Sequence, residues 1–234
     1  RMAERGHQPF VRETQRSANA INLVRSSVDR LRGAFALLGG VLVFQRIAQF
    51  GIDLDKSRNA MAALTGSVET ANKKLAELRE LAKASPGVTT TFATQLFQQL
   101  AAVRGIADQT INSVITSLGR LNTVFGNVGP EFARNLIQIF QQGFERSDIK
   151  EALTRVPIFE QLLEQAFGTK DPEKLRAAKA AGTLTMNNFL LGMSDSINKR
   201  LPNVTESLGG RLTKAFEDVK LKLSELGERM LRDF

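Results

Sequence analysis

Side chains able to perform catalysis or bind a metal are scarce in this sequence. The chain has 234 residues, no cysteine and one histidine, His7. The lack of cysteine excludes disulfides, thiolate metal sites and cysteine nucleophiles, and one imidazole is too few for a two-histidine metal motif. Neither GxxxxGK[ST] nor GxGxxG occurs. We therefore predict no catalytic, cofactor-binding or metal-binding residues, no cofactor, and no small-molecule substrate.

Neighbouring acids are the remaining catalytic option. The obvious clusters are Asp53 with Asp55 and Glu217 with Asp218. Acid–base hydrolysis needs two carboxyl groups that converge on one substrate. Helical residues one or two positions apart point in different directions. Both clusters are therefore interpreted as solvated surface charge.

The positive charge is concentrated at the start of the chain. The net charge is +8, and residues 1–50 contribute eight arginines against three acids, a local +5. Such a segment attracts phosphate backbones and anionic lipid, so transient contact with DNA or a membrane stays open. A solvated helix face is the simpler interpretation. No motif for reading a base sequence accompanies the arginines.

The hydrophobic pattern predicts an all-α protein. Apolar residues recur at intervals of three and four almost throughout, whereas strand alternation and hairpin turns are missing. We expect a flexible basic arm over 1–15, a long amphipathic or coiled-coil helix over 16–66, a compact cluster of short helices over 67–202, and a long amphipathic helix over 203–234. Fifteen phenylalanines, without tyrosine or tryptophan, favour aromatic rings that fill a core.

The first long helix carries a candidate seam for self-association. Its apolar residues step alternately by three and four, which is the heptad pattern of a coiled coil. The members of this seam are Ile21, Val24, Val28, Leu31, Phe35, Leu38 and Leu42. We predict a homo-oligomer of unspecified number. Packing of the seam against the protein's own core is the competing explanation.

Capping residues and glycines predict where the shorter helices begin and end. Ser67 is expected to cap a helix from Val68 to Lys83, and Thr185 one that starts at Met186. Other expected ends are starts at Pro130, Ser147-Asp148, Pro157, Asp171-Pro172 and Thr205, and stops at Gly66, Gly105, Gly126, Gly143, Gly168 and Gly182.

From about Ile47 onward, the order of these landmarks resembles the conserved amino-terminal domain of phage and prophage tail tape measure proteins. The residues that carry the resemblance are Leu64-Thr65-Gly66-Ser67, Ala71, Ala84-Ser85-Pro86, Gly105, Gln142-Gly143, Asp148, Val156-Pro157, Leu163, Phe167-Gly168, Leu175, Gly182-Thr183-Leu184-Thr185, Thr205-Glu206-Ser207-Leu208-Gly209-Gly210 and Leu226-Gly227. The family often has lysine where this chain has Gln142.

The resemblance implies a structural, non-enzymatic protein of the virion tail interior, present in the host cytoplasm during assembly. It would set tail length inside the tail tube and take part in genome ejection. Its implied partners are itself, the tail tube, the tail tip or baseplate, and tail assembly chaperones. At about 1.5 Å per residue, a fully helical chain of this length reaches only about 350 Å, which favours one segment of a longer protein.

Two other functions are weighed against this one. The first is a helical membrane-active or scaffold module that inserts the apolar stretch Gly33–Phe44 into lipid; this stretch is too short to span a bilayer as a helix. The second is a muralytic enzyme fused to a tail protein, which would need a glutamate in an apolar pocket. No glutamate stands out in that way, so we expect no enzyme.

Overall fold

The computed structural model describes residues 56–202 and 204–232, which belong to one compact unit, Asp53–Phe234. Within these ranges the regular structure is helical and no strand occurs. The predicted all-α class is thus confirmed for the described part of the chain. The predicted arm, the heptad seam and most of the first long helix lie outside the described residues.

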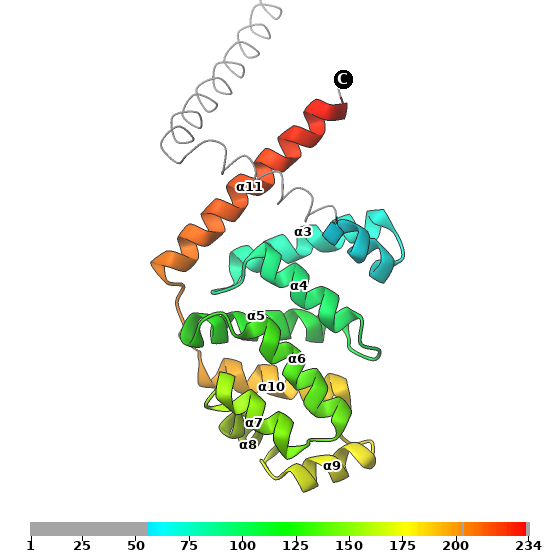
Figure 1. The fold of residues 1–234 in the computed structure, drawn as a ribbon, viewed down its shortest axis with the longest axis vertical. Coiled ribbons are helices and arrows are strands. Elements are labelled where there is room, and N and C mark those ends of the chain that lie inside the picture. The colour runs from blue at the N-terminus through cyan, green and yellow to red at the C-terminus, as the bar shows by residue number, and fades with distance from the viewer. Residues whose placement is uncertain (1–55, 203, 233–234) are drawn as a thin grey trace, which may run out of the picture. The chain divides into compact units, whose positions relative to one another are not determined.

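The helices follow one another with short connections (Figure 1). Residues 56–65 are helical and stop at Gly66, which has the positive φ of +85°. The helices that follow are α3 (Val68–Ala84), α4 (Thr90–Ala101), α5 (Asp108–Phe125), α6 (Gly129–Gln142), α7 (Arg146–Arg155), α8 (Phe159–Phe167), α9 (Pro172–Ala180), α10 (Met186–Arg200) and α11 (Leu208–Arg232).

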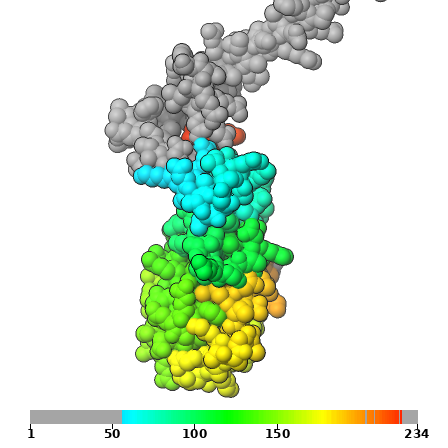
Figure 2. Space-filling model, turned by 90° about the vertical axis from the view of Figure 1, so that its right-hand side faces the viewer, coloured from blue at the N-terminus to red at the C-terminus, as the bar shows by residue number. Residues whose placement is uncertain are grey.

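Helix α5 lies at the centre of the packing. It packs against α4, α6 and α10, and α10 in turn packs against α8 and α6. One continuous apolar core joins α3 to α10, and its largest fully buried side chains include Phe132, Phe144, Phe159 and Phe189. The expected use of phenylalanine as core filler is therefore confirmed. In Figure 2 the yellow surface of α9 lies at the end of this unit farthest from the cyan surface of α3.

Three predicted caps form as expected. The Ser67 side chain accepts a hydrogen bond from the Thr70 amide at 3.1 Å, and the Thr185 side chain accepts one from the Asn188 amide at 3.2 Å. Asp171 accepts from the Glu173 amide at 3.0 Å, ahead of the proline that opens α9. Each cap satisfies a backbone donor that the first turn of a helix leaves without a partner.

Several predicted helix ends are wrong by two to four residues. Helix α4 ends at Ala101 rather than near Gly105, because the chain tightens there and the Val103 amide donates to the Leu100 carbonyl. Helix α8 begins at Phe159 rather than at Pro157. Helix α11 begins at Leu208 rather than near residue 205.

The predicted cap at Ser147-Asp148 is also wrong. Helix α7 begins at Arg146, and no side chain caps it. Asp148 is buried and accepts a hydrogen bond at 3.0 Å from the Gln138 side chain of α6. Its carboxylate therefore joins two helices instead of ending one.

None of the helices in the described ranges combines the length and the apolar character needed to cross a bilayer.

Candidate functional site

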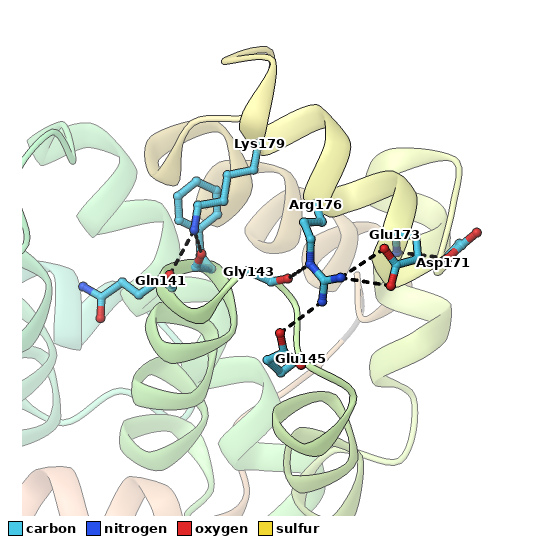
Figure 3. A network of polar contacts seen from close by, with 8 residues as sticks. Gln141, Gly143, Glu145, Asp171, Glu173, Arg176 and Lys179 are labelled. Atoms are coloured by element: carbon cyan, nitrogen blue, oxygen red, sulfur yellow. Dashed lines mark hydrogen bonds and ion pairs between the residues drawn. The ribbon is translucent and has the colours of Figure 1, made fainter.

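Two cations of α9 meet the carboxy-terminal end of α6 (Figure 3). Arg176 Nε donates to the Gly143 carbonyl at 2.8 Å, and Lys179 Nζ donates to the Phe140 and Gln141 carbonyls at 2.5 and 3.0 Å. Cations are favourable at this end of a helix because its last carbonyls have no partner within the helix. Arg176 also pairs with Glu173 and Glu145. With its donors engaged in this way, the network is a structural tie and offers no open binding group.

An open cleft of about 600 Å³ lies beside α7, α8 and the start of α9. Its wall contains Glu160 and Glu164, which are one helical turn apart, but Glu160 pairs with Lys170 at 2.9 Å. The hydrogen bond to Glu160 raises the pKa of Lys170 above its ordinary value. A general acid of the muralytic kind needs a carboxyl group in an apolar pocket. Glu160 is instead 43% exposed and ion-paired, an environment that favours its charged form.

Among the described residues, no group of three or more histidine, cysteine, aspartate or glutamate side chains could hold a metal ion.

Polar contacts attach one side of α11 to the turn between α3 and α4, residues 85–89. Lys214 Nζ donates to the Ser85 carbonyl at 2.6 Å and pairs with Glu206 at 2.9 Å. The Glu217 carboxylate accepts from the Thr90 and Thr91 amides at 2.6 and 2.8 Å. These contacts, which join residues more than 110 positions apart, are called the junction below.

The junction places a charge of the favourable sign at each of two helix ends. Ser85 follows the last residue of α3, where the partial charge is negative, and Lys214 reaches its carbonyl. Thr90 and Thr91 are the first residues of α4, where the partial charge is positive, and Glu217 accepts from both amides. Thr89 accepts from the next amide, that of Phe92, at 3.2 Å. Three of the four donors that open α4 are thus satisfied by side chains.

The opposite side of α11 is apolar and faces water. Leu212, Phe216 and Val219 are 59%, 60% and 43% exposed. On a helix these positions lie on one face, because they are separated by four and three residues. We call these three residues the apolar stripe. The helix therefore attaches through its polar side and leaves its apolar side uncovered, the reverse of the usual arrangement.

The structure corrects one expectation about acidic residues and leaves others untested. Asp218 is exposed, as predicted, but Glu217 is half-buried and bonded to α4 rather than simply solvated. Its role was missed because its partners are remote in sequence. Asp53, Asp55 and the heptad seam at 21–42 lie outside the described residues, so their roles stay predictions.

Replacing Glu217 with alanine should loosen the junction. Two amides of α4 lose their acceptor, a change comparable to losing a helix cap, which costs about 1–2 kcal/mol. We expect hydrogen exchange at Thr90 and Thr91 to become about tenfold faster, measured by mass spectrometry or nuclear magnetic resonance. Asp218→Ala removes the same charge from the neighbouring exposed position and is the matched control. Equal exchange in both variants would show that Glu217 does not hold the junction.

The described residues thus form an all-α unit whose last helix displays an uncovered apolar face. No protein-family model, no curated protein and no solved structure matches this chain.

Proposed function

We propose that this chain is a segment of a tail tape measure protein, a structural component that sets the tail length of a phage or a related particle. The supporting observation is where the residues of the resemblance lie in the fold. Ser67 caps α3, Thr185 caps α10, and Gly143 and Gly168 end α6 and α8 in the left-handed conformation. A resemblance carried by residues that begin and end helices supports a shared order of helices.

In this proposal the chain has no enzymatic role. Its implied partners are the tail tube, the tail tip or baseplate, and tail assembly chaperones. It lies in the tail interior after assembly in the host cytoplasm, and it takes part in genome ejection. Self-association through the heptad seam at 21–42 is part of the proposal. The alternative membrane-active module depends on Gly33–Phe44, which lies outside the described residues.

Tail length in particles that carry modified genes tests the proposal. Duplicating residues 22–42 adds three heptads in phase, and a helix that runs along the tube should lengthen the tail by about 32 Å per copy. One, two and four added copies should give a proportional series in electron micrographs. The matched control inserts 21 glycine and serine residues at position 203, between α10 and α11.

A ruler made of helix responds to added helix, so the control should leave the tail length unchanged. Tails of constant length in the heptad series would contradict the ruler role for this part of the chain. Particles that lack this protein altogether, judged by mass spectrometry of purified virions, would contradict the proposal as a whole.

A further inference from the structure

The apolar stripe of α11 is an unoccupied surface rather than the margin of the core. Its residues lie on the side of the helix away from Lys214, Glu217 and the buried Leu221, which face the rest of the unit. A seated helix gains little from exposing a phenylalanine and a leucine at about 60%, because each exposed side chain forgoes about 1.5–3 kcal/mol of burial. The stripe therefore has the properties of a docking surface.

The width of the stripe favours a helix as the partner. The same alternation of four and three residues continues along the sequence of α11 at Leu223, Leu226 and Met230. A strict alternation of this kind covers a narrow band, which is the seam of a coiled coil, whereas a helix that lies on a broad surface carries a wider apolar arc. Knobs of a second helix fit such a seam, and a flat lipid surface does not require it.

The charges beside the stripe select the chemistry of that partner. When Phe216 is placed at position a and Val219 at d, the flanking e and g positions hold Thr213, Lys220, Ala215 and Lys222. Lys222 and the nearby Arg211 are exposed. The acids Glu217 and Asp218 lie on other sides of the helix. The stripe is thus bordered by neutral and cationic residues only.

We propose that the apolar stripe of α11 binds an amphipathic helix of another protein whose own apolar seam is flanked by acidic residues. Carboxylates at the partner's e and g positions would face Lys220 and Lys222, which sets both the choice of partner and its orientation. A second copy of α11 would bring no acid to these positions. The inference goes beyond the proposed function and holds whether or not the chain belongs to a tail.

Two synthetic peptides test the proposal with the full chain. Both have four heptads with isoleucine at a and leucine at d; one carries glutamate at e and g, and the other lysine. Fluorescence anisotropy should show the acidic peptide bound at least about tenfold more tightly than the basic one. The preference should decrease as salt is added, because these pairs are exposed.

Variants of α11 locate the binding site. Phe216→Ser with Val219→Ser should weaken binding of the acidic peptide at least about tenfold. Val124→Ser is the matched control, since Val124 is 47% exposed on α5, away from the stripe. Arg211→Glu with Lys222→Glu should reverse the preference toward the basic peptide. These positions are exposed, so the variants should keep the fold, which far-ultraviolet circular dichroism checks.

Four outcomes would overturn the proposal. These are equal affinity for the two peptides, binding that survives the double serine variant, self-association of the chain that the double serine variant abolishes, and stripe-dependent binding to vesicles of phosphatidylcholine with phosphatidylserine. The third would assign the stripe to a second copy, and the fourth would assign it to anionic lipid. The predicted seam at 21–42 can also bind the peptides, so dependence on Phe216 is the deciding measurement.

Discussion

Replacing Phe189 with alanine should lower the free energy of unfolding by about 3–5 kcal/mol, the range for removing a large aromatic ring from a packed core. Phe189 on α10 is fully buried. Its ring centroid lies 5.6 Å from that of Phe140, 5.4 Å from that of Phe144 and 5.5 Å from that of Phe167. The substitution therefore removes contacts with α6, α8 and the α6–α7 connection together. Urea titration followed by circular dichroism measures the loss.

Phe216→Ala is the matched control for this experiment. The same ring is removed, but Phe216 is 60% exposed and its loss should change the free energy of unfolding by about 0.5 kcal/mol or less. Similar losses in the two variants would mean that the Phe189 ring is not central to the core. A strong loss in Phe216→Ala would instead show that the stripe is covered in the free protein.

One member of this phenylalanine cluster shows what the sequence could not reveal. Gly143 was predicted to end α6, and it does so with φ of +84°. Phe144 follows it with φ of +62°, a conformation that is costly for a residue with a side chain. Its ring is fully buried between Phe140 and Phe189. Burial of the ring in the core offsets the backbone strain, and that balance depends on contacts that no local pattern records.

The elements that the sequence predicted well are those governed by neighbouring residues. Ser67, Asp171 and Thr185 cap helices because the donors they satisfy lie within two or three residues. The same local logic failed at Asp148, whose carboxylate bonds to Gln138 of another helix. Helix starts can thus be predicted when the partner is local, and they fail when a tertiary contact captures the side chain.

The candidate interaction site divides in the same way. The amphipathic pattern of the last helix was evident in the sequence, and Leu212, Phe216 and Val219 were assigned to one stripe. The outward orientation of that stripe was not predictable, because it depends on Lys214 and Glu217 bonding to a turn more than 120 residues away. Hydrophobic periodicity identifies a face, but only the packing determines whether the protein covers it.

Replacing Gly119 with alanine should destabilise the fold by about 1–3 kcal/mol, although alanine is the better helix former. A Cβ atom at Gly119 on α5 would lie 2.2 Å from Val88 Cγ2 and 2.7 Å from the Pro86 carbonyl oxygen. The second clash is with backbone, so a side-chain rotation cannot relieve it. The α3–α4 turn would have to move away from α5, which chemical denaturation should detect as a lower midpoint.

Gly209→Ala gives the opposite expectation and is the matched control. This glycine also lies in a helix, but the nearest atom to an added Cβ is Ser207 Oγ at 3.9 Å, so alanine should stabilise α11 by up to about 1 kcal/mol. A loss in Gly119→Ala with a gain in Gly209→Ala would confirm close approach at α5. Two gains would refute it. The turn that Gly119→Ala displaces is also the one bound by Lys214 and Glu217, so this variant should speed hydrogen exchange at Thr90 and Thr91 as Glu217→Ala does. Shared exchange behaviour would establish that the position of α11 depends on the packing of α5 beneath that turn.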